Sequence, residues 1–390
     1  RLRPVIEALT TEDASPAVLA GLHDALAQLL HLSGSYDEQL AASVRAAELA
    51  RASGDKRLLA QVEMRRGNAL RMLGRLREAA DVLEAAIDLL AAAGDTRTLA
   101  HALDNVSMVY LLRGGFDRTA NAIARALTLA EEVGDPLMVA LMIFRRGMNS
   151  FAAGAWTDAQ RDFERAAVIV REVGVAWVSP YAAAGRGILS LAQGRYGVAA
   201  DELDKAMALA ELSGDMQVLR WAQGALAERD LLDGRPDAAT SRLEPLLDRP
   251  GQQEGIVTYL LPLVAWAALD QGDEVQAAAV LDECLARAVP EHILLGQVDA
   301  LRVLAALRLR QNRRQDAEAA LNDALALSRA MPYPYAEAKA LYVYGLLHGT
   351  SGEPAQARGR FESALAICRG LGERLYAERI ERALGSLSEG

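Results

Sequence analysis

The sequence contains few of the residues that cross-link a protein or perform catalysis. Its 390 residues include two cysteines, Cys284 and Cys368, which cannot build a disulfide framework and indicate a reducing compartment. Five histidines are scattered without the spacing of metal ligands. No phosphate-binding loop (GxxxxGKS or GxxxxGKT), HExxH, GxSxG or Cys-x-x-Cys motif occurs. We therefore predict no catalytic residue, no metal site and no cofactor, and expect a protein that is not an enzyme.

Excess positive charge and long hydrophobic runs are also missing. The 42 Lys and Arg residues are outnumbered by 52 Asp and Glu residues, so the chain offers no general field for phosphates and nucleic acid is not an expected partner. The longest apolar stretch, residues 256–269, is interrupted by Pro262 and is shorter than the ~18–20 residues that span a bilayer. No signal peptide opens the chain, which begins with Arg1. We expect a fragment of a larger or processed cytoplasmic polypeptide that does not bind membranes.

The sequence is organised as a repeat of forty residues. Turn residues recur at intervals of 40, with one interval of 38 before Gly272: Gly34, Gly74, Gly114, Gly154, Gly194, Gly234, Gly272, Asn312 and Gly352. Half a period away lie Gly-Asp pairs such as Gly54-Asp55 and Gly94-Asp95. Between these signals, apolar residues at i, i+3, i+4 and i+7 predict helices. Because Gly favours a helix end and Asp caps the next helix, each period is predicted as helix A, turn, helix B, turn. Later in the chain, Pro290 and the pair Pro332 and Pro334 replace the Gly-Asp turns.

Small and large residues occupy fixed places in the repeat. Seven positions before each turn residue, nothing larger than serine occurs: Ala27, Gly67, Ser107, Gly147, Gly187, Ala227, Ala265, Ala305 and Gly345. Nine positions after it, a large apolar residue recurs, for example Leu83, Phe163 and Leu203. Small residues let helix axes approach, and the large residue fills the space between neighbouring helices.

The combination of small residue, turn glycine, bulky residue, alanine and large apolar residue resembles the tetratricopeptide repeat (TPR). One repeat reproduces the whole pattern with Gly147, Gly154, Trp156, Ala159, Phe163 and Ala166, and another with Gly187, Gly194, Tyr196, Ala199, Leu203 and Ala206. The resemblance implies an all-α, right-handed TPR superhelix (α-solenoid) of about nine repeats over residues 16–372. Residues 1–15 would end a preceding helix or linker, and residues 373–390 would form a C-terminal capping helix and tail. With its 40-residue period, longer than the usual ~34, the repeat array is similar to the sensor regions of bacterial STAND, MalT-like and LuxR-type signal-transduction regulators.

In TPR superhelices helix A lines a concave groove. Carried over to this chain, the resemblance implies a groove with an aromatic centre and polar ends, formed by Met64, Asn68, Arg71, His101, Asp104, Met108, Phe144, Met148, Phe151, Tyr181, Ile188, Trp221, Glu228, Tyr259, Trp266, Arg302 and Tyr342. Asp299 and Lys339 hold the same positions in later repeats. The aromatic residues either cover one another or anchor a ligand. The lysines of the family's carboxylate clamp are absent, so we do not predict binding of chaperone tails.

Function is expected to be recognition rather than catalysis. The resemblance implies a module that binds a protein or peptide in the groove as the sensor domain of a larger bacterial regulatory ATPase, whose ATPase or effector domain would be a further partner. Two alternatives stay open. In a MalT-like small-molecule sensor, Trp221, Glu228 and Trp266 would hold the ligand; an assembly scaffold would bind through its convex faces or ends. We also predict an exposed loop, or a hinge, near residue 250, and a partly exposed Cys368.

Overall fold

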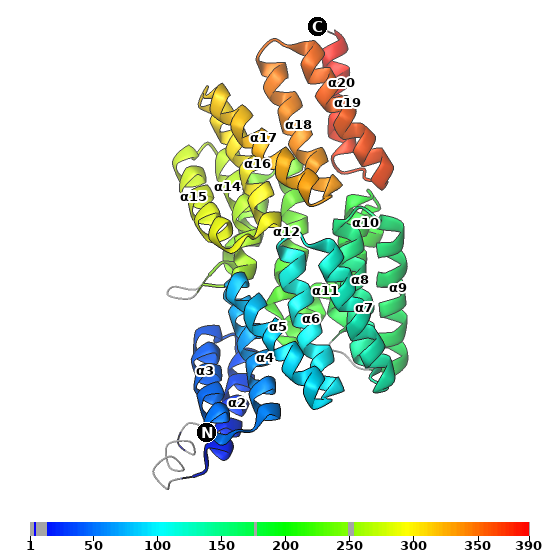
Figure 1. The fold of residues 1–390 in the computed structure, drawn as a ribbon. Helices are drawn as coiled ribbons and strands as arrows, with labels where there is room; N and C mark the ends of the chain where they lie inside the picture. Colours follow the sequence, from blue (N-terminus) through cyan, green and yellow to red (C-terminus); the bar gives the residue numbers. More distant parts are fainter. Residues whose placement is uncertain (1–3, 5–13, 175–177, 249–252, 390) are drawn as a thin grey trace. The chain divides into compact units, whose positions relative to one another are not determined.

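The computed structural model describes residue 4 and residues 14–174, 178–248 and 253–389. In these residues all regular structure is helical, as predicted (Figure 1). The helices pair as members A and B of nine antiparallel repeats: α2 (Pro16–Leu32) with α3 (Tyr36–Ser53), α4 (Lys56–Met72) with α5 (Leu76–Ala93), α6 (Thr96–Leu112) with α7 (Phe116–Glu132), α8 (Pro136–Ala152) with α9 (Trp156–Val173), α10 (Ser179–Ala192) with α11 (Tyr196–Ser213), α12 (Met216–Leu232) with α13 (Pro236–Leu243), α14 (Leu261–Asp270) with α15 (Glu274–Glu291), α16 (Leu294–Arg310) with α17 (Arg314–Ala330), and α18 (Pro334–Thr350) with α19 (Pro354–Leu371). Helix α20 (Ala377–Glu389) follows them. Of the predicted N-terminal segment 1–15, only residues 4, 14 and 15 are among the described residues.

The turns form as their residues predict. The turn glycines take the left-handed conformation, with φ of 72° at Gly34 and 88° at Gly272. The side chain of Asp55 accepts from the amide of Leu58 at 2.9 Å and so caps α4. One expectation was wrong: Pro290 lies inside the last turn of α15, and His292 takes the left-handed position that ends this helix.

The sixth repeat departs from the pattern because its helix B is short. Helix α13 ends at Leu243, and the 3-10 helix η1 (Glu244–Leu246) follows, because a proline at position 245 cannot continue the α-helical hydrogen bonding. Of the predicted exposed loop, residues 249–252 lie outside the described residues. Gly255, where the 3-10 helix η2 (Gly255–Tyr259) begins, is buried rather than exposed. A Cβ placed there would lie 2.6 Å from backbone atoms of Gly74, so the prediction of an exposed loop was wrong at this residue.

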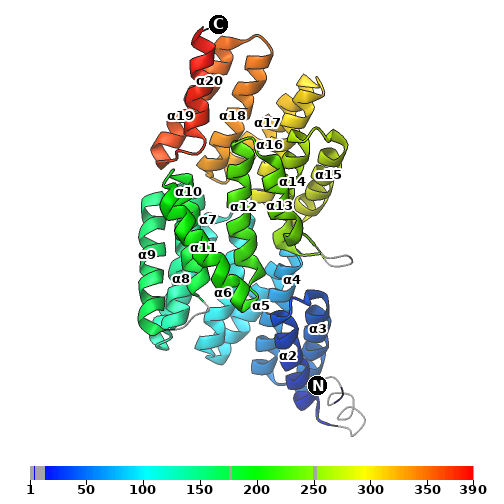
Figure 2. The same cartoon turned by 180° about the vertical axis from the view of Figure 1, so that it is seen from behind.

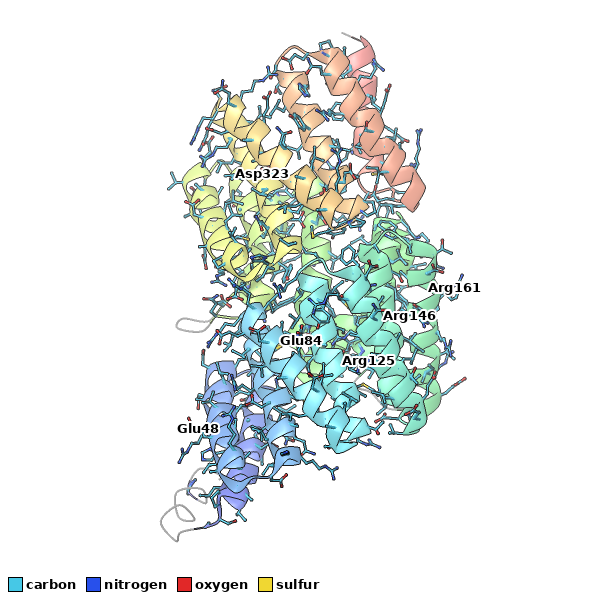
Figure 3. The ribbon with its side chains drawn as sticks, viewed as in Figure 1. Glu48, Glu84, Arg125, Arg146, Arg161 and Asp323 are labelled. Carbon is cyan, nitrogen blue, oxygen red and sulfur yellow. The ribbon has the colours of Figure 1, made fainter. Side chains whose placement is uncertain are left out.

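The small and large residues of the repeat meet in the core. A Cβ placed on Gly147 would lie 2.6 Å from the ring of Phe163, and one on Gly187 would lie 2.7 Å from Leu203. All nine small residues are buried. Charged side chains such as Glu48, Arg125 and Arg161 lie on the outer surface of the helices (Figure 3).

Contacts within the chain group it into two compact units. Unit 1 comprises Arg1–Arg113, Asp117–Met142 and Asp248–Ile256, and unit 2 comprises Gly114–Phe116, Ile143–Leu247 and Val257–Gly390. Helices α2 to α7 therefore belong almost entirely to unit 1, and α9 to α20 to unit 2. Figure 2 shows the labelled helices from the side opposite to Figure 1. The right-handed course of the superhelix stays a prediction.

Candidate functional site

Within unit 2, the last repeats pack against the turns of the earlier ones. Met331 contacts the position of Gly114, where a side chain would clash with it, and Pro334 lies 2.6 Å from a Cβ placed on Gly154. The backbone amide of Arg374, just before α20, donates to the carbonyl of Ala192 at 2.8 Å. These contacts bring the A helices of early and late repeats of unit 2 around a common interior space.

This space contains a cavity of about 260 Å³, which we call the unit 2 cavity. Its wall comes from α8, α10, α12, η2, α14, α16, α18 and the turn before α20. The apolar and aromatic lining consists mainly of Phe151, Ile188, Leu191, Trp221, Tyr259, Leu260, Leu263, Tyr333, Tyr335 and Leu375. Four charged residues complete it: Arg220, Glu228, Asp299 and Lys339. An apolar chamber with a few converging polar groups is the usual form of a ligand site.

The charged groups form a cluster around Glu228 of α12. The ammonium group of Lys339 donates to both Glu228 carboxylate oxygens, at 2.7 and 3.0 Å, and the Tyr376 hydroxyl donates to one of them at 2.8 Å. The Arg302 guanidinium lies 3.9 Å from Glu228 and 3.3 Å from Asp299. One carboxylate thus joins α12 to α16, α18 and the start of α20.

Aromatic rings surround the two cations of this cluster. The Lys339 ammonium lies 4.3 Å from the centre of the Tyr335 ring, and the Arg302 guanidinium lies 5.0 Å from that of Trp266. A cation over an aromatic face is attracted by the ring quadrupole, and more strongly when water is excluded. The cluster is therefore held in place by packing as well as by ion pairing.

Protonation states follow from this environment. Burial opposes ionisation of Glu228, but Lys339 and Arg302 outweigh it and lower the pKa of the carboxyl group. Burial raises the pKa of the Tyr259 and Tyr335 hydroxyls well above their ordinary range. At neutral pH the cavity therefore presents an ionised Glu228 together with protonated phenols.

Two buried polar atoms beside the cavity have no hydrogen-bond partner among the described residues. They are the hydroxyl oxygen of Tyr259, which lines the cavity, and Nη2 of Arg302, which lies directly behind Glu228 and Asp299. Arg302 is only 3% exposed. An unsatisfied buried polar group costs about 1–3 kcal/mol, so the Tyr259 hydroxyl would gain from a ligand that offers an acceptor. Nη2 of Arg302 lies 3.3 Å from Asp299 and is not part of the cavity lining.

Seven of the residues predicted at groove positions line the unit 2 cavity: Phe151, Ile188, Trp221, Glu228, Tyr259, Asp299 and Lys339. Trp266 and Arg302 do not line the cavity but belong to the charge cluster beside it. Tyr342 packs against Tyr376, with ring centres 6.0 Å apart. Phe144 and Tyr181 instead pack beside Trp221, with ring centres 6.2 and 5.9 Å from it. Because Phe144 is 1% exposed, it is a core residue in this structure. Met148 is half-buried and lies outside the lining.

The remaining predicted residues lie in unit 1 and line no part of this cavity. Met64, Asp104 and Met108 are buried, whereas His101 is exposed. Asn68 accepts a hydrogen bond of 2.8 Å from Arg71, one turn further along α4.

The groove predicted from the sequence lacks several aromatic residues that lie at the cavity or in its charge cluster. Tyr333 and Tyr335 flank Pro334 in the turn and first residues of α18, and Tyr376 precedes α20. These positions do not belong to the repeating A-helix pattern, so the repeat could not indicate them. The one feature of the sequence that could have indicated them is that two aromatic residues, which are scarce in this chain, lie together at a proline-rich turn.

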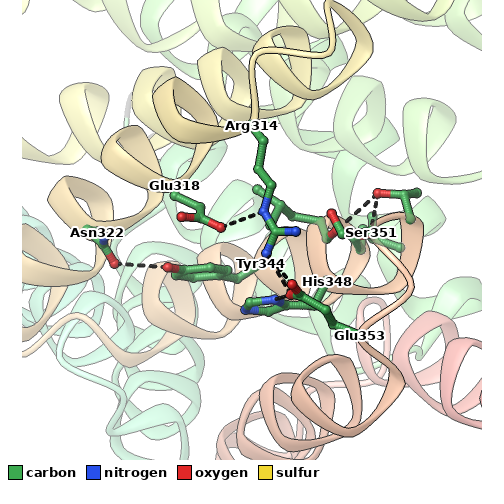
Figure 4. Close-up of polar contacts among 10 residues, drawn as sticks. Arg314, Glu318, Asn322, Tyr344, His348, Ser351 and Glu353 are labelled. Carbon is green, nitrogen blue, oxygen red and sulfur yellow. Dashed lines mark hydrogen bonds and ion pairs between the residues drawn. The ribbon is translucent and has the colours of Figure 1, made fainter.

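A second polar cluster joins repeats eight and nine (Figure 4). Arg314 donates to both Glu353 oxygens, at 2.6 and 2.7 Å, and Glu353 also pairs with His348 at 2.6 Å. The His348 ring stacks on Tyr344 with centres 5.1 Å apart. The hydrogen bonds from Arg314 and His348 lower the pKa of Glu353 to about 2. We interpret this partly buried cluster as a link between repeats.

Within the described part of the chain, no group of three or more His, Cys, Asp or Glu side chains is arranged to hold a metal ion. No helix there is both long and apolar enough to cross a membrane.

Comparison with known proteins identifies a fold class. No protein-family model matches the chain, and no curated protein matches it. A solved Rap protein complexed with Competence and Sporulation Factor is 13% identical, with 81% of this chain and 76% of that one covered at a TM-score of 0.51. Aspartyl phosphate phosphatase F from Bacillus subtilis (13% identity, 84% and 75% covered, TM-score 0.47) and yeast Tom70 (13%, 95% and 96%, 0.39) are more weakly similar. The chain has a tetratricopeptide-like helical repeat fold.

Proposed function

We propose that this chain is a non-enzymatic recognition module that binds a peptide or protein segment and takes one or two of its side chains into the unit 2 cavity. The observation that supports this most directly is the cavity itself, in which aromatic walls meet an ionised cluster and a buried Tyr259 hydroxyl without a partner. The Rap protein of similar fold is complexed with Competence and Sporulation Factor, which supports ligand binding by such a solenoid.

The size of the cavity favours an anchoring role over complete enclosure of a ligand. At about 260 Å³ it is smaller than the roughly 300–1,000 Å³ pockets that hold drug-sized molecules. Buried aromatic residues at the centre of an interface usually supply most of the binding energy. Trp221, Tyr259 and Tyr335 would therefore act as the anchor pocket, while the rest of the ligand would contact surrounding surfaces.

The proposal extends to the protein's biological setting. We place the chain in the ligand-sensing part of a larger bacterial signal-transduction or transcription-regulatory protein, in which another domain would respond to ligand binding. The 40-residue period and the Gly-Asp turns support this placement. The two free, buried cysteines are compatible with a cytoplasmic location.

Selection of peptides from a random library, followed by calorimetry, tests the proposal. Trp221→Ala should weaken the selected peptide at least tenfold, because it removes an aromatic wall of the cavity. Tyr110→Ala, a change to a partly buried tyrosine of unit 1, provides the control and should bind normally. Equal affinities in both variants would exclude the cavity as the binding site and favour the scaffold alternative.

The aromatic lining of the cavity and its few charged groups also support a small-molecule sensor as a second candidate. A thermal-shift screen with small metabolites distinguishes the two functions. A small molecule that raises the melting temperature of the wild type but not of Trp221→Ala would favour this alternative, particularly if no peptide is selected.

A further inference from the structure

The polar groups of the unit 2 cavity indicate the chemical class of its ligand, an inference that rests on the proposed function. We infer that the cavity binds an apolar or aromatic group that carries a carboxylate, and that the hydroxyl of Tyr259 and the ammonium group of Lys339 hold this carboxylate. The ligand would thus be an acidic end or side chain beside an apolar side chain.

Two hydrogen-bond donors at the cavity wall are not fully used. Lys339 uses two N–H groups on Glu228, which leaves its third for another acceptor. The Tyr259 hydroxyl is buried and donates to no described residue. The oxygens of Glu228 already accept from Lys339 and Tyr376. A carboxylate accepts several hydrogen bonds and brings no donor of its own, so it complements this arrangement.

Two other nearby carboxylates, those of Glu373 and Asp299, do not take the place of the ligand carboxylate. Glu373, close to Lys339, accepts instead from the amides of Tyr376 and Ala377 at 2.7 and 3.0 Å. Asp299 faces Arg302, with 3.3 Å between the charged atoms. A cationic ligand group would have to approach Lys339 and Arg302, whose like charges oppose it.

Tyr259 offers a clean test, because its hydroxyl has no hydrogen bond to lose in the free protein. Tyr259→Phe should therefore fold normally, with a melting temperature equal to or above that of the wild type. A purely structural role would show itself as a lower melting temperature and as equal loss of affinity for charged and neutral ligands. The matched control is Tyr196→Phe, at a tyrosine of unit 2 outside the cavity lining.

The probes are N-acetyl-phenylalanine, which has a carboxylate, and its neutral amide, measured by saturation-transfer NMR and tryptophan fluorescence. We expect the acid to bind the wild type about tenfold tighter than the amide, and Tyr259→Phe to lower affinity for the acid about tenfold with little effect on the amide. Equal binding of acid and amide, an unaffected acid in Tyr259→Phe, or no binding of either probe would overturn the inference.

These outcomes are separate from those that test the proposed function. If selected peptides require Trp221 but bind equally well without any carboxylate, the recognition module stands and the inference about its ligand fails. If no peptide depends on Trp221, the proposed function fails as well. If the acid is preferred, two kinds of peptide show where the ligand's carboxylate comes from. Preference for peptides that end in phenylalanine indicates a terminal carboxylate. Preference for amidated peptides with an internal Asp or Glu beside phenylalanine indicates a side-chain carboxylate.

Discussion

The contact between Gly147 and Phe163 gives a sharp test of how the repeats pack. A Cβ on Gly147 of α8 would lie 2.6 and 2.8 Å from two atoms of the Phe163 ring. On the other side, a Cβ on Gly185 of α10 would lie 2.7 and 2.8 Å from the same ring. Phe163 is 3% exposed and lies between the two glycines. Moving the ring away from one helix therefore presses it against the other.

The expected cost of Gly147→Ala follows from two opposing effects. Alanine is favoured over glycine inside a helix by about 1 kcal/mol. Overpacking a well-filled core costs about 1–3 kcal/mol. The net change is a loss of stability of about 0–2 kcal/mol. Gly359→Ala in α19, where a Cβ meets nothing within 4 Å, provides the control and should raise stability by about 1 kcal/mol.

A second substitution should relieve the clash. Phe163→Ala removes the ring that a Cβ at position 147 would meet. Gly147→Ala should therefore cost less in a Phe163→Ala background than in the wild type. A double-mutant cycle measured by urea unfolding and circular dichroism reports this coupling. The reasoning is refuted if the coupling is zero, or if Gly147→Ala stabilises the chain as much as Gly359→Ala does.

Three further predictions concern ionisable groups. Glu228→Gln should lower the free energy of unfolding by about 3 kcal/mol at neutral pH, because it leaves buried cations uncompensated. Because folding lowers the pKa of Glu228, the stability that its carboxylate contributes is present above pH 4.5 and is lost as the pH falls through the folded-state pKa. NMR titration should give Glu353 a pKa of about 2, rising toward its ordinary value near 4.5 in Arg314→Ala. Burial raises the thiol pKa of Cys284 to about 12 and also raises that of Cys368, so neither should react with Ellman's reagent at pH 8 until the chain is unfolded.

Each of these has an outcome that would contradict it. Acid unfolding curves of equal shape for wild type and Glu228→Gln would show that Glu228 contributes no pH-dependent stability. A Glu353 pKa that does not respond to Arg314→Ala would remove the ion pair as its cause. Rapid reaction of Cys368 in the folded chain would contradict its burial, and would restore the partial exposure that the sequence predicted and the structure does not show.

The accuracy of the sequence-based predictions depended on whether they concerned neighbouring or distant helices. The pairing of Gly147 with Phe163 spans 16 residues and could be predicted from the repeat, because it recurs with the same spacing. The contact of Pro334 with the Gly154 turn joins positions 180 residues apart and recurs nowhere in the pattern. For the same reason the aromatic A-helix residue Trp221 was placed in the groove in advance, whereas Tyr335 and Tyr376 were not.

By itself the sequence determined the helical repeat, because helix periodicity, turn glycines and small residues act between neighbours in the chain. The resemblance carried by that repeat implied groove positions for Phe151, Trp221 and Glu228, which line the unit 2 cavity, and for Phe144, which is a core residue. Only the tertiary structure decided which distant repeats of unit 2 together line one cavity. This depends on contacts between repeats far apart in the sequence, in which Lys339 and Tyr376 meet Glu228 across the interior. A periodic pattern specifies the local angle between successive helices, whereas closure depends on the sum of many such angles, and that sum converts a predicted open groove into a cavity.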